Sequence, residues 1–150
     1  MARATTPIEV REVVDGRDAP VLLVGAVATT GNDLLVVRRR SDHVEGLWSV
    51  PTTPVAVGET LVEAAARSVK DQAALDGLAG PFLGWWESIG GDHHDVVACF
   101  RTVVLDRQDP VAGPDVVEAR WMPVWDVAEL PLTDGLAELL ADHGVIDTLA

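Results

Sequence analysis

Runs of apolar and polar residues along the chain predict several strands and three helices. Valine- and leucine-rich runs predict strands at about 8–14, 20–29, 33–39, 81–89, 94–105 and 116–123. The second and third runs are joined by "TGND", and its Gly31-Asn32 pair favours a hairpin because both residues adopt the left-handed backbone of tight turns. A short extended piece, "LWSVP", and an irregular piece, "TTPVAV", follow this hairpin.

The helical pattern is strongest over residues 60–75. Thr60 stands three residues before Glu63, which is the spacing of a capping box, and Gly77 is the expected stop signal. Shorter helices are predicted at 125–129 and 133–143. Strands on both sides of an amphipathic helix, with another helix at the end, predict an α/β fold in which a mixed sheet packs between helices.

Two polar side chains interrupt the apolar side of the 60–75 helix. Successive residues lie roughly 100° apart on a helix, which groups on one side the charged residues Glu59, Glu63, Arg67, Lys70 and Asp71. Ser68 and Gln72 fall instead among the apolar residues, one turn apart. Either Ser68 bonds back to the helix carbonyl four residues earlier and Gln72 reaches a strand end, or this part of the helix faces a ligand pocket.

Composition narrows the functional classes. A chain of 150 residues suits one domain, 1–150, with its own core. Its net charge of −13 disfavours binding of a nucleic-acid polymer. No apolar run approaches the length of a membrane span, and the start, "MARATTPIEVREVV", has no apolar core of a signal peptide. The single cysteine, Cys99, fits a reducing compartment, so a cytoplasmic protein without a membrane partner is expected.

Some arginines and tryptophans are candidates for ligand contacts. The basic run "RRR", Arg38 to Arg40, ends a predicted strand and could meet a small phosphorylated ligand or could simply be solvated; Arg38 and Arg40 are the two that we select as ligand contacts. Trp85 and Trp86 point to opposite sides of a strand, so one can fill the core while the other lines a pocket or an interface. Aromatic side chains in a pocket wall suit a flat ligand, and we select Trp48 and Trp86 for this role. Packing in the core or in a dimer interface is the alternative.

The segment "GGDHHDVV" supplies candidate acid–base groups. Strand alternation sends His93 and Asp95 to one face and His94 to the other. A histidine beside a pocket can act as a general acid or base or bind a softer metal, whereas a solvated hairpin end is the other explanation. Cys99 lies in the apolar run "VVACF", which favours a core residue over a nucleophile.

One long segment, "GLWSVPTTPVAVGETLVEAAARSVKDQAAL", resembles the Nudix box of the Nudix hydrolase superfamily, with its lead-in. Glu59 and Arg67 match the box at the required spacing, as do the aliphatic residues Val69 and Leu75. The strand "LLVVRRR" and the later "EARWMPVWDVAEL" also resemble segments of that family, so the similarity covers about residues 20–143. The resemblance implies a Nudix-like α/β/α sandwich with a short N-terminal strand at 8–14, a box at 53–75 and a C-terminal helix at 133–143.

The catalytic part of the box departs from the family pattern. Family acids hold divalent metals that bridge a diphosphate and activate water, because Mg²⁺ prefers hard anionic oxygens. Those acid positions are Ser68, Asp71 and Gln72 here. The family's Gly-Gly is Thr52-Thr53, and the box glycine is Ala74. Glu59 and Arg67 match the family's ion pair between loop and helix, which supports the architecture and not the catalysis.

The resemblance therefore implies a Nudix-like protein with a degenerate box that binds a nucleotide or a related nucleoside-diphosphate-type molecule. Its pocket is expected between the 60–75 helix, residues 51–57 and the sheet, and metal-dependent pyrophosphohydrolase activity is expected to be weak or absent. If the family mechanism survives, Asp71 and Glu118 would hold Mg²⁺ or Mn²⁺; otherwise no cofactor is expected. Glu118 can instead pair with Arg120 on the same strand face.

Two alternatives remain open. One is a metal-independent enzyme that uses Asp71, His93 or Asp95 as acid–base groups on a non-phosphate substrate. The other is a ligand sensor or interaction module without catalysis. Family members often dimerise, so a homodimer is also an expectation.

Overall fold

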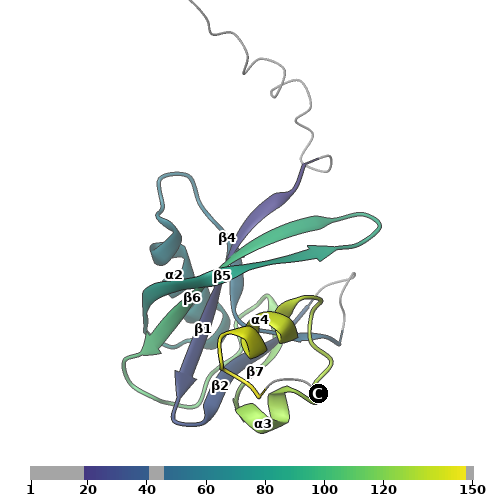
Figure 1. Ribbon diagram of the computed structural model, residues 1–150. Helices are drawn as coiled ribbons and strands as arrows, with labels where there is room; N and C mark the ends of the chain where they lie inside the picture. Colours follow the sequence, from purple (N-terminus) through teal and green to yellow (C-terminus); the bar gives the residue numbers. More distant parts are fainter. Residues whose placement is uncertain (1–18, 41–45, 148–150) are drawn as a thin grey trace, which may run out of the picture.

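A mixed sheet of seven strands organises the computed structural model, which describes residues 19–40 and 46–147. Its strands are β1 (Val21–Thr30), β2 (Asp33–Arg39), β3 (Trp48–Ser49), β4 (Thr52–Pro54), β5 (Gly77–Ile89), β6 (His94–Val104) and β7 (Val116–Pro123). The helices are α2 (Leu61–Ala73), α3 (Val124–Val127) and α4 (Leu136–Asp142) (Figure 1). The strand predicted at 8–14 lies outside the described residues.

Strand β1 is the centre of the sheet. It pairs in parallel with β6, from Val21 opposite Asp95 to Ala28 opposite Thr102. Its other neighbours are antiparallel: β4 over Leu23 to Gly25, and β2 through the hairpin at Gly31. Gly31 has a φ of +58°, so the expected left-handed turn is present at the glycine. β5 forms one edge of the sheet beside β6, and β7 pairs with β2.

Alternation along β1 divides the interior into two cores. Leu23 and Val27 pack toward α4, whereas Val24 and Ala26 pack toward α2. A sheet with both faces covered needs apolar residues at nearly every position, and β1 has them. The predicted α/β fold, a mixed sheet between helices, is confirmed.

Three expectations about single residues can be compared with these cores. Trp86 is buried and Trp85 is exposed, as predicted for neighbours on a strand. Cys99 is buried in the core that faces α4, and burial raises the pKa of its thiol to about 12. Cys99 is therefore a protonated core residue at neutral pH. None of the helices in the described ranges is long and apolar enough to cross a membrane.

Helix α2 begins with the predicted capping box. The backbone N–H of Glu63 donates to Thr60 Oγ1 at 3.2 Å, and Glu63 Oε1 accepts from the backbone N–H of Thr60 at 2.8 Å. The predicted stop was wrong, because Gly77 already belongs to β5. The helix ends at Ala73, and Ala74 adopts the left-handed conformation with a φ of 59° while its N–H bonds to the carbonyl of Lys70.

Ala74→Gly is expected to stabilise the protein by about 1 kcal/mol, because a left-handed conformation is strained for alanine and free for glycine. The change appears as a rise of several degrees in the midpoint of thermal unfolding. Ala66→Gly, inside the same helix, is the matched control and should lower the midpoint instead. Equal effects at the two positions would contradict a strained helix end.

Other boundaries differ slightly from the expectations. The segment expected to be irregular after "LWSVP" contains β4, whose Thr52 to Pro54 pair with β1. α3 spans Val124–Val127, and α4 begins at Leu136, after a left-handed Gly135. The earlier start predicted at 133 is excluded by Gly135, whose φ of 86° is not helical.

Candidate functional site

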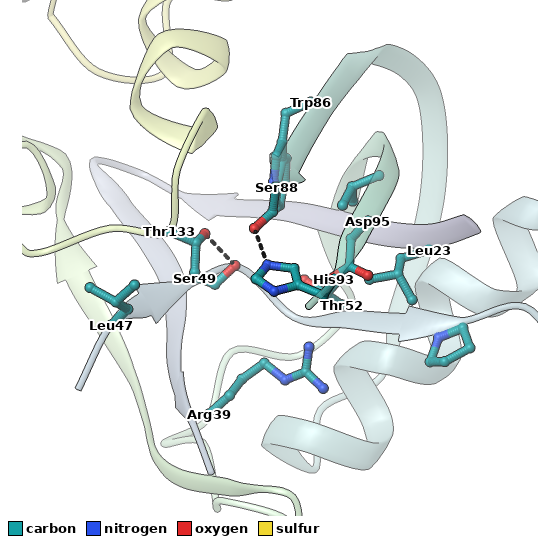
Figure 2. A pocket seen from close by; sticks show the side chains of 12 residues that line it. Leu23, Arg39, Leu47, Ser49, Thr52, Trp86, Ser88, His93, Asp95 and Thr133 are labelled. Carbon is teal, nitrogen blue, oxygen red and sulfur yellow. Dashed lines mark hydrogen bonds between the residues drawn. The ribbon is translucent and has the colours of Figure 1, made fainter. Parts of the chain in front are cut away.

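A cavity of about 300 Å³ opens on the face of the sheet that is opposite α2 (Figure 2). Its floor is made by side chains of β1, β5 and β6 that also belong to the core facing α4. Its walls combine apolar and polar groups, and the lining residues are Leu23, Arg39, Leu47, Ser49, Thr52, Pro54, Trp86, Ser88, His93, Asp95, Val97 and Thr133. Residues 51–57 and the sheet contribute as expected, but no residue of α2 does.

Two buried donors of this cavity have no partner in the described part of the chain. They are Nε of Arg39 and Nε1 of Trp86. Trp86 is only 6% exposed, so its N–H is shielded from bulk water. A buried donor without an acceptor costs about 1–3 kcal/mol, and native proteins rarely leave one unpaired. Both donors therefore favour a bound group with acceptor oxygens.

His93 projects into the cavity from the hairpin between β5 and β6. Its Nε2 lies 3.2 Å from Oγ of Ser88, and its Nδ1 lies 3.3 Å from Oδ1 of Asp92. Asp95 lines the cavity beside it (Figure 2). On the other face of the strand, His94 pairs with Glu87 at 2.8 Å. The predicted separation of His93 and Asp95 from His94 is thus present.

The two polar residues on the apolar side of α2 are bonded to backbone. Ser68 is fully buried and its hydroxyl donates to the carbonyl of Ala65, three residues earlier, at 2.7 Å. The Gln72 amide bonds to both backbone groups of Thr52: Nε2 donates to the carbonyl at 2.6 Å, and Oε1 accepts from the N–H at 3.3 Å. These contacts match the explanation by local bonding, with the acceptor of Ser68 one residue later than expected.

Arg67 ties α2 to the segment before it. Its Nε donates to Oε2 of Glu59 at 2.8 Å and its Nη2 donates to Oε1 of Glu59 at 2.9 Å. The same guanidinium bonds to Oγ1 of Thr53, the carbonyl of Pro54 and, at 3.3 Å, Oδ2 of Asp71. This pair is the structural contact expected for Glu59 and Arg67.

The stability that Glu59 contributes is expected to depend on pH. Hydrogen bonds from Arg67, and then from the N–H of Ala56, lower the pKa of Glu59 from 4.5 to about 2. A depressed folded-state pKa stabilises the protein above pH 4.5, and that contribution is lost as the pH falls toward 2. The gap in unfolding midpoint between wild type and Glu59→Gln should be full at pH 7 and should narrow over this window. A constant gap would contradict the pairing.

The two predicted metal ligands bond to different arginines. Asp71 is 57% exposed and pairs with Arg67. Glu118 pairs with Arg120 at 2.6 Å and with Arg38 at 3.4 Å, as the surface-pair alternative expected. Within residues 19–40 and 46–147, no group of three or more His, Cys, Asp or Glu side chains is arranged to hold a metal ion.

Only some of the predicted site residues line the cavity: Trp86, His93 and Asp95. Trp48 is buried beside it, with the guanidinium groups of Arg38 and Arg120 over its ring at 5.7 and 5.9 Å. The other predicted residues that do not line it are Arg40, Ser68, Asp71, Gln72 and Glu118. Sequence reasoning missed Ser88, and within the basic run it selected Arg38 and Arg40 where Arg39 lines the cavity. The signal for Ser88 was its position two residues after Trp86, on the same face of β5.

The sequence of this chain is similar to the sequences of other proteins. The chain is 27% identical over 114 residues to an ADP-ribose pyrophosphatase of Methanocaldococcus jannaschii, covering 75% of this chain and 65% of that protein. It is 27% identical over 118 residues to Nudix hydrolase 5 of Arabidopsis thaliana, covering 72% of this chain and 38% of that protein. The chain thus spans less than two thirds of the length of either relative.

Solved structures share the fold. The MutT protein of Methanosarcina mazei superimposes with a TM-score of 0.74 at 18% identity, covering 83% of this chain and 94% of that one. The NUDIX domain of Shewanella oneidensis NrtR, solved with ADP ribose, has a TM-score of 0.67 at 22% identity, covering 92% and 98%. The family model described as NUDIX domain matches residues 19–143. This chain therefore belongs to the NUDIX family.

Proposed function

We propose that this protein binds a nucleoside-diphosphate-type small molecule, such as ADP-ribose, in the cavity of Figure 2 and hydrolyses it weakly or not at all with Mg²⁺ or Mn²⁺. The observation that carries the proposal is the double hydrogen bond of Gln72 to Thr52, at a position where the family has a metal-binding acid. The choice of ligand is supported by the M. jannaschii relative, named for ADP-ribose, and by the NrtR domain solved with it.

The side chains at the family's metal positions do not fit a Mg²⁺ ion. Mg²⁺ requires hard, mostly anionic oxygens in octahedral geometry. The hydroxyl of Ser68 and the amide of Gln72 are neutral, buried and already bonded to backbone. Asp71 keeps a carboxylate, but it is exposed and paired with Arg67. One paired carboxylate is a poor substitute for a cluster of acids, so we derive no hydrolytic step through a metal.

The cavity offers a different kind of site. Its volume of about 300 Å³ is at the lower end for small-molecule pockets. Arg39 brings a permanent positive charge and an unpaired Nε, which suit the oxygens of a phosphate. Trp86 adds a second donor, and the carboxylate of Asp95 can accept from a ligand hydroxyl or amino group. These groups support binding of a polar, anionic ligand without requiring its cleavage.

Binding and turnover can be measured separately. ADP-ribose is expected to raise the midpoint of thermal unfolding of the wild type in the presence of chelator, and to release little or no AMP with Mg²⁺ or Mn²⁺. Arg39→Leu should abolish the rise. Arg107→Leu is the matched control, because Arg107 pairs with Asp33 outside the cavity, and it should retain the rise.

Two results would overturn the proposal. One is AMP release at a rate typical of an enzyme, on the order of 1 s⁻¹ or faster, that requires a metal and disappears with Asp71→Ala. The other is an equal rise in midpoint for Arg39→Leu and wild type, which would move the ligand away from the cavity.

A further inference from the structure

Ser88 and His93 line the cavity and bond to each other (Figure 2). Asp92 does not line the cavity and its side chain is 60% exposed, but it bonds to the other nitrogen of the His93 ring, so the order is hydroxyl, imidazole, carboxylate. Ser88 Oγ lies 3.2 Å from Nε2 of His93, and Nδ1 of the same ring lies 3.3 Å from Oδ1 of Asp92. This connectivity activates a serine in hydrolases of unrelated folds. We propose that Ser88 is the nucleophile of a metal-independent hydrolysis of small carboxylic esters, with His93 as general base and Asp92 as its positioning residue.

The hairpin between β5 and β6 builds this arrangement. Ser88 is near the end of β5 and pairs with Asp95, and the N–H of Gly90 donates to the carbonyl of His93 at 2.9 Å. A Cβ added at Gly90 would lie 2.3 Å from Cε1 of His93. The glycine therefore leaves the space that the imidazole occupies. Because the ring is only 22% exposed, it is held toward the cavity rather than toward bulk water.

The carboxylate of Asp92 determines the tautomer of His93. An ionised carboxylate only accepts hydrogen bonds, so Nδ1 must carry the proton that it donates to Asp92. Nε2 of the neutral ring then keeps its lone pair and accepts from the hydroxyl of Ser88. This is the protonation state that a general base needs before the reaction starts.

Nε1 of Trp86, which lies on the same face of β5 as Ser88, is the candidate donor to the oxyanion that forms during ester hydrolysis. Nε of Arg39 and Nε1 of Trp86 are buried and have no acceptor among the described residues. Trp86 precedes Ser88 by two positions, so both side chains project from the same face of β5. Preorganised donors that face a developing negative charge are a large source of catalysis. The proposal gives the unpaired N–H of Trp86 an acceptor during the reaction.

The reaction balances with water as the only co-reactant. Ser88 Oγ attacks the ester carbonyl carbon while its proton passes to Nε2 of His93, and the carbonyl π electrons move to the oxygen. Collapse of this intermediate breaks the bond to the alcohol oxygen, which takes the proton from Nε2 and leaves. Water then attacks the acyl group on Ser88 and gives one proton to Nε2. The acid departs, and Nε2 returns the proton to Ser88 Oγ.

This activity uses neither Arg67, Asp71 nor any metal, and it does not depend on nucleotide binding. The cavity of about 300 Å³ has room for an ester with a small acyl group. The cavity is the one proposed above for a nucleotide, but labelling and ester hydrolysis are measured without a nucleotide, so failure of one proposal is distinguishable from failure of the other.

The test combines covalent labelling with ester hydrolysis, both in the presence of chelator. A fluorophosphonate probe should add once to the folded wild type, and peptide mapping should place the adduct on Ser88. Hydrolysis of p-nitrophenyl acetate should saturate with substrate. Ser88→Ala and His93→Gln should abolish labelling and lower kcat at least about 100-fold. Asp92→Asn should lower kcat with an unchanged KM, because it acts through the histidine.

His94→Gln is the matched control, because this neighbouring histidine pairs with Glu87 outside the cavity; it should label and hydrolyse as the wild type does. The proposal is overturned by no adduct on the folded wild type, by an adduct on another residue, or by equal losses in the two histidine variants. If Ser88→Ala does not fold, His93→Gln decides the matter, since it retains the serine: persistent labelling in that variant also overturns the proposal.

Discussion

The Gln72→Glu variant is expected to be less stable than the wild type by about 3 kcal/mol at pH 7. Gln72 is 5% exposed, and its amide both donates to and accepts from the Thr52 peptide. A carboxylate retains the bond from the Thr52 N–H but sets a second oxygen against the Thr52 carbonyl, where the amide had a 2.6 Å donor. The variant thus buries a charge and repels an acceptor. Denaturant unfolding measures the loss.

The loss should shrink in acid. Burial raises the folded-state pKa of the introduced carboxyl above its unfolded value of about 4.3. Below that value the group is protonated in both states and can donate to the Thr52 carbonyl, so the penalty appears only as the pH rises. Asp71→Glu, at an exposed position one residue earlier, is the control and should change stability by less than about 0.5 kcal/mol. A Gln72→Glu protein as stable as wild type at pH 7 would show that the amide is not held.

The hydrogen bonds between Gln72 and Thr52 also affect a variant in which acids are restored at the family's metal-binding positions. A triple variant, Ser68→Glu with Asp71→Glu and Gln72→Glu, is expected to regain little metal-dependent hydrolysis. Ser68 has no exposed surface, so a longer side chain there must displace its neighbours. Thr52 and Thr53 are paired with β1 as part of β4, and this strand conformation differs from the glycine loop of the family.

Gly113→Ala is expected to destabilise the protein by about 2–3 kcal/mol. A Cβ at Gly113 would lie 1.8 Å from the backbone oxygen of Asp71, and a backbone atom cannot rotate away as a side chain can. The segment at this glycine covers the end of α2: the N–H of Gly113 bonds to the carbonyl of Gln72, and the N–H of Val111 bonds to the carbonyl of Ala73. Displacing this segment would leave the carbonyls of Gln72 and Ala73 without their hydrogen-bond donors at the end of the helix.

Gly91→Ala is the matched control for Gly113→Ala. An added Cβ at Gly91 has no atom within 4 Å, and the backbone there does not need a positive φ. Its unfolding midpoint should stay close to that of the wild type, as measured by the same thermal melts. A Gly113→Ala protein that melts with the Gly91→Ala protein would mean that the segment near residue 113 does not pack on the helix as described.

Local chemistry explains why most of the fold could be predicted. Thr60 and Glu63 make contacts within one helical turn, and Gly31 acts within one hairpin, so their spacing alone is informative. The helix stop could not be found in the same way. The helix ends before Ala74 although local propensity disfavours a left-handed alanine. Val111 and Gly113, which are distant in sequence, donate to the last helix carbonyls and stabilise this end.

The site was less accessible to sequence reasoning because it depends on which strands meet. The basic run at the end of β2 was visible, but the pairing with β7 shifts register between Arg38 and Arg39, and it is Arg39 that lines the cavity. Ser68 and Gln72 were found on the inward side of α2, and the choice between a ligand and a backbone partner required the position of Thr52. Ser88 becomes a candidate site residue only because it contacts His93 across the hairpin, and the sequence does not show that contact.

The parallel pairing of β1 with β6 also constrains how the chain reaches this state. The strands of each hairpin are neighbours in sequence, whereas β2, α2 and β5 lie between Val21 and Asp95 along the chain. Closing such a long loop is entropically costly and slows folding. Leu23 of β1 and Val97 of β6 stand opposite each other in the floor of the cavity. The floor of the cavity is therefore complete only when this long-range pairing has formed, and a ligand bound there would stabilise only the fully formed sheet.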